Sequence, residues 1–62
     1  MNAADATTRF TVGDPVKIRE REEWYTGTVT AVTELTVTVK YDSNPTPVVH
    51  DASTWVDLVK TK

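Results

Sequence analysis

The sequence contains no cysteine and a single histidine, and both scarcities exclude kinds of site. Without cysteine, the chain can form neither a disulfide framework nor a thiolate metal site. One histidine is too few for a structural zinc cluster, which takes its ligands mainly from cysteine and histidine. A chain of 62 residues therefore has to fold as one small domain on its apolar core alone, near the lower size limit for doing so.

Long apolar runs are also missing, because no uninterrupted apolar stretch exceeds two residues. A membrane-spanning helix needs about 20 consecutive apolar residues, so none is predicted. The N-terminal stretch MNAADATTRF lacks the basic start and the apolar segment of a signal peptide. We therefore expect a soluble, cytoplasmic protein without a membrane partner.

Blocks of one charge sign are absent as well. Nine acidic and seven basic side chains give a net charge of −2, and the signs alternate closely in KIREREE at residues 17–23. Non-specific affinity for nucleic acid comes largely from lysine and arginine side chains that neutralise phosphates. The charge balance therefore disfavours a nucleic-acid partner.

From residue 10 onward the chain has the alternation of apolar and polar residues that is typical of β-strands. Residues 1–9 are rich in alanine, threonine and aspartate without any apolar period, which predicts a flexible N-terminal arm. Residues 10–60 are accordingly predicted to form the folded domain.

Three strands are predicted in the first part of this domain. The turn GDP at residues 13–15 leads into a first strand, which is followed by a charged connection, REREE at residues 19–23. Residues 24–32 predict a second strand and residues 35–42 a third. They are joined at residues 33–34 by a tight hairpin, or else by a longer loop or a bulge.

The second part predicts a proline-rich loop at residues 42–47, a short strand at residues 48–50, a helical turn around Trp55 and a final strand at residues 56–60. Five short strands with brief connections predict an all-β fold, a small five-stranded SH3-like barrel. The side chains expected to face its core are Val12, Val16, Ile18, Tyr25, Val29, Ala31, Leu35, Val37, Val39, Tyr41, Val49 and Leu58.

The segments VGDPVKI, EEWYTGTVTAV, LTVTVKYD and WVDLV together resemble the SH3-like barrels of the Tudor and Agenet type. The shared features are a Gly-Asp turn before the first strand, an aromatic residue opening the second, and a valine-rich third strand ending in tyrosine. The resemblance covers about residues 11–60. A weaker similarity to the SH3-like peripheral subunit of photosystem I rests on VKI, WY and GTV in the same order, and it implies docking onto a larger assembly without catalysis.

The first resemblance also implies candidate binding residues. Tudor domains that read methylated lysine or arginine hold the methylammonium group in an aromatic cage by cation–π attraction. Tyr25 and Tyr41 match two of the cage aromatics. Arg19 or its neighbours, and Asn44, stand where the family has further aromatic residues.

Reactive side chains form no recognised catalytic motif. His50 and Asp51 are adjacent, with Ser43 and Ser53 nearby, but there is no nucleophile-elbow pattern and no glycine-rich oxyanion loop. Neighbouring strand residues also point to opposite faces, so His50 is interpreted as a strand-end residue on the rim. No catalytic residue is assigned, and we do not expect an enzyme.

Metal binding is not predicted either. The candidate carboxylates are dispersed along the chain and follow no calcium-loop spacing; they are Asp14, Asp42, Asp51 and Asp57. Solvated turns account for them, so we expect no metal and no cofactor.

The predicted contact surface is an aromatic patch made of Trp24, Tyr25, Tyr41 and Trp55, with Arg19 and Arg21 at its rim. Alternation places Trp24 on the face opposite Tyr25, exposed among threonines unless the aliphatic stems of the REREE segment cover its indole. Trp55 has an alternative interpretation as a plug that closes one end of the barrel.

We therefore expect a small non-catalytic module that binds a protein or a peptide through rigid aromatic side chains. One alternative is a nucleic-acid-binding barrel that uses the same aromatics with Lys17, Arg19, Arg21 and Lys40. Another is a structural subunit that buries the patch in a homo-oligomer or a larger assembly.

Overall fold

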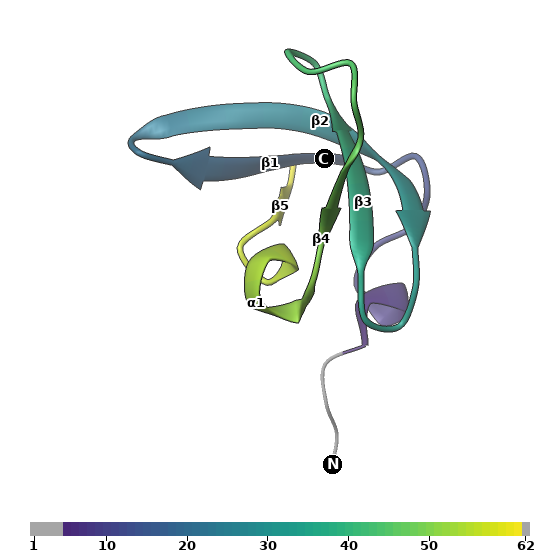
Figure 1. Cartoon of the computed structure of the whole chain (residues 1–62). Coiled ribbons are helices and arrows are strands. Elements are labelled where there is room, and N and C mark those ends of the chain that lie inside the picture. Colours follow the sequence, from purple (N-terminus) through teal and green to yellow (C-terminus); the bar gives the residue numbers. More distant parts are fainter. Residues whose placement is uncertain (1–4, 62) are drawn as a thin grey trace.

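The computed structural model describes residues 5–61 and contains five strands. They are β1 (Pro15–Glu20), β2 (Glu23–Val32), β3 (Val37–Tyr41), β4 (Val48–His50) and β5 (Val59–Lys60). A 3-10 helix, η1 (Ala6–Thr8), precedes β1, and a single-turn helix, α1 (Ala52–Trp55), separates β4 from β5 (Figure 1). The predicted all-β class with five strands is confirmed. Within residues 5–61, no helix is long and apolar enough to cross a membrane.

The strands form one sheet in the order β4-β3-β2-β1-β5, and every neighbouring pair is antiparallel. The sheet curls around the core, and α1 links its two edge strands, β4 and β5 (Figure 1). No pairing joins β4 to β5 in the described part of the chain. The sheet is therefore open, whereas the sequence predicted a closed barrel.

The hairpin of β1 and β2 extends further than predicted. The two strands pair until Glu20 lies opposite Glu23, and only Arg21 and Glu22 form the turn. Both turn residues have positive φ, 50° and 69°, as in the primed two-residue turns whose twist matches that of the strands. The prediction of a charged connection at residues 19–23 is wrong because this end of the hairpin projects beyond the core, so neither of its faces has to be apolar (Figure 1).

A bulge interrupts the pairing of β2 with β3. The register shifts between Val29 and Ala31, so Ala31 is exposed and Val32 packs against the core instead. A one-residue shift moves the following side chains to the other face of the sheet. The prediction that Ala31 faces inward is wrong for this reason.

The connection from β2 to β3 is the longer of the predicted alternatives, a loop at residues 33–36. The hydroxyl oxygen of Thr33 accepts hydrogen bonds from the backbone N–H groups of Leu35, at 3.2 Å, and Thr36, at 2.9 Å. This local bonding keeps Leu35 out of β3. Leu35 is exposed, and its predicted inward position is wrong.

The core contains ten buried apolar side chains: Ala6, Phe10, Val16, Ile18, Val29, Val37, Val39, Tyr41, Trp55 and Leu58. Two further inward predictions, Val12 and Val49, are wrong, since both side chains are exposed. Val12 lies in the turn before β1, and β4 turns Val48 and His50 inward.

The segment at residues 5–10, before β1, packs against the rest of the fold. Ala6 has no exposed surface, and its backbone N–H donates to the Glu34 carbonyl at 3.1 Å. Phe10 then packs edge-on against Trp55, with 6.0 Å between ring centroids. Within the predicted flexible arm, residues 5–9 include η1, and the guanidinium of Arg9 lies 5.5 Å from the Trp55 ring centroid. Residues 1–4 of that prediction lie outside the described residues.

Candidate functional site

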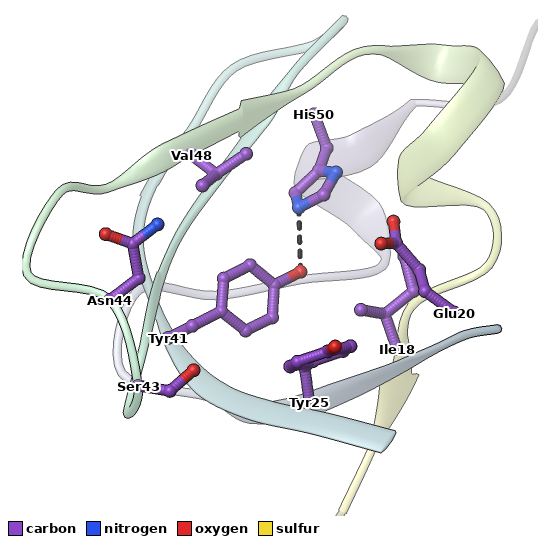
Figure 2. Close-up of a pocket in the computed structure, with 8 residues that line it drawn as sticks. All are labelled: Ile18, Glu20, Tyr25, Tyr41, Ser43, Asn44, Val48 and His50. Atoms are coloured by element: carbon purple, nitrogen blue, oxygen red, sulfur yellow. Dashed lines mark hydrogen bonds between the residues drawn. The ribbon is translucent and has the colours of Figure 1, made fainter. Parts of the chain in front are cut away.

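One pocket on the concave side of the sheet brings together aromatic and polar side chains. It has a volume of about 240 Å³ and is lined by Ile18, Glu20, Tyr25, Tyr41, Ser43, Asn44, Val48 and His50 (Figure 2). These residues come from β1, β2, β3, β4 and the loop between β3 and β4. We call this feature the pocket.

Alternation along β1 and β2 positions the side chains that form one wall of the pocket. Ile18 and Tyr25 are cross-strand partners on β1 and β2, so their side chains point to the same face. Glu20 lies two residues after Ile18 and shares that face. The β1–β2 hairpin extends beyond the core at this point, and Tyr25 therefore keeps 38% of its surface exposed. Its predicted inward direction is correct, but it forms a wall of the pocket and is not part of the buried core.

The opposite wall is made by Tyr41, the last residue of β3, and His50, the last residue of β4. The Tyr41 hydroxyl lies 2.7 Å from Nε2 of His50 (Figure 2). The other ring nitrogen, Nδ1, lies 3.3 Å from the hydroxyl oxygen of Thr54. Both nitrogens of this imidazole are therefore engaged within the protein.

The neighbouring hydrogen bonds indicate which nitrogen of the His50 imidazole carries the proton. The Thr54 hydroxyl donates to the carbonyl of Asp51 at 3.2 Å, so its single hydrogen is used there. Thr54 can then only accept from His50 Nδ1–H, which leaves Nε2 as the acceptor of the Tyr41 hydroxyl proton. A neutral imidazole with the proton on Nδ1 therefore gives both ring nitrogens a hydrogen-bond partner.

Burial favours the neutral forms of both rings. It lowers the pKa of His50, against opposing contributions from the carboxylates of Glu20 and Asp51. It also raises the pKa of Tyr41 to about 12, and the charge of Glu20 acts in the same direction. At neutral pH the pocket therefore carries one negative charge, that of Glu20, beside two neutral aromatic partners.

The predicted contact residues are divided by the sheet. Tyr25 and Tyr41 meet in the pocket, which Asn44 also lines. Trp24 and Arg19 are cross-strand partners on the opposite face, where alternation predicted Trp24. The amine of Lys17 lies over the Trp24 indole, 4.5 Å from the ring centroid.

The other two predicted contact residues lie apart from the pocket. Trp55 has no exposed surface, and its Nε1–H donates to the Leu35 carbonyl at 3.1 Å. Its interpretation as a plug of the core agrees with this burial, whereas its place in a surface patch does not. Arg21 occupies the turn between β1 and β2.

Sequence reasoning missed four residues as members of one site: Glu20, Ser43, Val48 and His50. Alternation from Ile18 gives the direction of Glu20, so that residue could have been found. His50 was placed on the rim, yet it is only 8% exposed. The three-residue strand β4 offers too little alternation to fix which of its side chains face inward.

The dispersed reactive groups have structural roles. The carboxylate of Asp51 caps α1 by accepting from the backbone N–H and the hydroxyl of Ser53. Asp14 accepts from the Thr11 backbone N–H and pairs with Lys60. Among residues 5–61, no three histidine, aspartate or glutamate side chains converge as metal ligands.

Comparison of the chain with models of known protein families, with curated proteins and with solved structures finds no match. The side chains that line the pocket therefore provide the only indication of its ligand. Two tyrosine rings and a carboxylate around a small open volume can hold a cationic group, because both ring faces and carboxylates attract positive charge.

Proposed function

We propose that this protein is a small non-catalytic interaction module of SH3-like architecture whose pocket holds a cationic side chain of a protein or peptide partner. The observation that carries the proposal is the convergence of Tyr25, Tyr41 and Glu20 on one pocket. The resemblance to Tudor-type barrels, whose cages bind methylated lysine or arginine, agrees with this ligand chemistry.

The size of the pocket supports a side chain as the ligand. Sites for cofactors and drug-sized molecules typically enclose about 300–1,000 Å³. At about 240 Å³ the pocket is smaller than that range and open to solvent, so it suits the end of one side chain of a larger partner.

The charges in the pocket support a cation. Glu20 supplies a negative charge, while the imidazole of His50 is held neutral and therefore does not oppose a positive group. A cation over an aromatic face gains about 0.5–1 kcal/mol when exposed and about 2 kcal/mol when desolvated. One such contact raises the affinity only about 2- to 30-fold, so the rest of the partner has to supply most of the binding free energy.

A peptide titration tests the proposal. We expect peptides that contain lysine, arginine or trimethyl-lysine to shift the NMR signals of Tyr25, Tyr41 and His50, and a glutamine-containing peptide to shift them far less. The Tyr25→Ala variant should lose the response, because it removes one wall of the pocket. Trp24→Leu, on the opposite face, is the matched control and should keep it.

Two results would overturn the proposal. One is an equal response to the glutamine peptide, which would remove the role of charge. The other is a response confined to residues outside the pocket, which would place the binding surface elsewhere.

A further inference from the structure

The face of the sheet opposite the pocket carries basic side chains, threonines and one tryptophan. We call it the outer face and define it by side chains that β1, β2, β3 and the residue after β3 turn away from the core: Lys17, Arg19, Trp24, Thr26, Thr28, Lys40 and Asp42. The strand registers join these side chains across the sheet. Lys17 lies opposite Thr26, Arg19 opposite Trp24, and Thr28 opposite Lys40.

Charge is segregated between the two faces. The outer face holds three of the seven basic side chains, Lys17, Arg19 and Lys40, and one carboxylate, Asp42, which accepts a hydrogen bond from the Thr26 hydroxyl at 3.0 Å. Glu20 and Glu23 lie on the other face, according to the same alternation. The net negative charge of the chain therefore conceals a sheet face with positive charge.

Trp24 is placed among these cations. Its side chain keeps 49% of its surface exposed, the Lys17 amine lies 4.5 Å from its ring centroid, and Arg19 is its cross-strand neighbour. Although the Lys17 amine lies over the ring, about half of the surface of this large aromatic side chain stays available to a ligand. An indole flanked by basic side chains offers a stacking surface and phosphate contacts at once.

We propose that the outer face binds a short single strand of nucleic acid, with one base stacked on Trp24 and the backbone phosphates paired with Lys17, Arg19 and Lys40. From Trp24 to Thr28, which lies beside Lys40, β2 extends by about 13 Å at the usual rise per residue. About four nucleotides at a stacked spacing of about 3.4 Å cover that length. The sequence placed the same cations beside Tyr25 and Tyr41, but those rings line the pocket on the other side of the sheet.

A flat aromatic contact distinguishes this ligand from other polyanions. An acidic peptide would satisfy the three cations without using the indole, whereas a base stacks on it. The site is separate from the pocket, so it does not depend on the function proposed for the pocket.

The salt dependence of binding tests the phosphate contacts. Anisotropy of a dye-labelled deoxythymidine decamer is measured with the full 62-residue chain at several salt concentrations. Three phosphate contacts predict a slope of log K against log salt of about −2, at about −0.7 per contact for single strands. Lys17→Gln, and separately Lys40→Gln, should each reduce the slope by about 0.7. Lys60→Gln, which removes a charge that pairs with Asp14, should leave the slope unchanged.

Substitution of Trp24 tests the stacking contact. Trp24→Leu should weaken binding roughly 5- to 150-fold, and Trp24→Phe should retain most of the affinity, because stacking on an aromatic ring contributes in this range. An abasic strand of the same length should bind more weakly than the decamer. Circular dichroism and thermal unfolding of each variant show that the fold is retained.

Several results would overturn the proposal. These are no binding of the decamer at millimolar concentration and low salt, equal affinity for the abasic strand, or an unchanged affinity of Trp24→Leu. Displacement of the decamer by an equimolar glutamate decapeptide would assign the face to acidic proteins instead.

Discussion

The hydroxyl group of Tyr41 donates a hydrogen bond of 2.7 Å to Nε2 of His50 at the back of the pocket. The bond joins the last residues of β3 and β4, and its direction follows from the tautomer that the Thr54 hydroxyl favours at Nδ1. The same two side chains thus contribute to the stability of the sheet and to the charge of the pocket. Their titration and their replacement give the first two predictions.

The free energy of unfolding should fall as the pH is lowered through the region below pH 6.5. Burial lowers the pKa of His50 in the folded protein, so the unfolded chain binds more protons there. Stability is then present above the ordinary histidine pKa, and it is lost as the pH falls toward the lowered value. Urea unfolding at intervals between pH 5 and 7.5 measures this slope.

The single histidine of the chain makes the control direct. The His50→Gln variant should lose this part of the pH dependence, even though its stability is lower at every pH. An unchanged slope between pH 5.5 and 6.5 in the variant would mean that another group is responsible.

Replacement of Tyr41 by phenylalanine should destabilise the protein by about 1–3 kcal/mol, because the buried Nε2 of His50 loses its partner. Urea unfolding compares it with Tyr25→Phe. The Tyr25 hydroxyl makes only an exposed contact with Glu23 at 3.4 Å, so its loss should cost less than about 1 kcal/mol. Equal losses in the two variants would contradict the role of the buried bond.

The Tyr41→Phe variant also tests the raised pKa of the Tyr41 hydroxyl. Since the pKa of Tyr41 is raised to about 12, the folded protein should show a tyrosinate absorbance step near that pH, which Tyr41→Phe removes. The unfolded chain loses this proton near pH 10, so stability should decline as the pH rises between about 10 and 12.

Glycine in place of Glu22 should stabilise the β1–β2 hairpin. Glu22 has a φ of 69°, and a left-handed backbone costs a non-glycine residue about 1–2 kcal/mol. For a domain of this size, each kcal/mol shifts the midpoint of thermal unfolding by about 4–8 °C. Glu23→Gly, one residue later within β2, is the control and should lower the midpoint. A lower midpoint for Glu22→Gly would show that the turn does not need this backbone.

Gly27 should not tolerate alanine. A Cβ atom there would lie 2.6 Å from the carbonyl oxygen of Lys40 and 2.9 Å from the Cα of Tyr41, both of them backbone atoms of β3. Crowding of this kind typically costs about 1–3 kcal/mol. The neighbouring Thr28→Ala on the outer face provides the comparison, and we expect a change below about 1 kcal/mol. Similar stabilities for the two variants would contradict the close approach of β2 and β3.

The regular parts of the fold could be predicted because alternation acts locally. Val16 and Ile18 in β1, and Val37 and Val39 in β3, face the core as the sequence indicated. The bulge near Thr30 could not be predicted, because it adds a residue without changing the composition of the strand. The pattern of β2 therefore holds up to Val29 and fails beyond it.

The candidate site could be predicted only in part for a different reason. Tyr25 and Tyr41 were identified because each is an aromatic residue at a distinctive strand position, Tyr25 near the start of β2 and Tyr41 at the end of β3. Their meeting with His50 depends on the pairing of β3 with β4 and on the curl of the sheet, which bring distant residues together. For Trp55 the sequence left a surface position and a plug of the core as alternatives, because its burial depends on contacts with Phe10 and the segment before it, which are distant in sequence.

The most direct test of the central claim compares two peptides that differ only in the charge of one side chain. One carries trimethyl-lysine, and the other carries the same side chain with carbon in place of the quaternary nitrogen. Isothermal titration should show that the cationic peptide binds about 2- to 30-fold more tightly, the range that a cation–π contact provides. Glu20→Gln should reduce this preference, since Glu20 is the carboxylate that lines the pocket. Equal affinity, or tighter binding of the neutral peptide, would contradict a pocket built for cationic side chains.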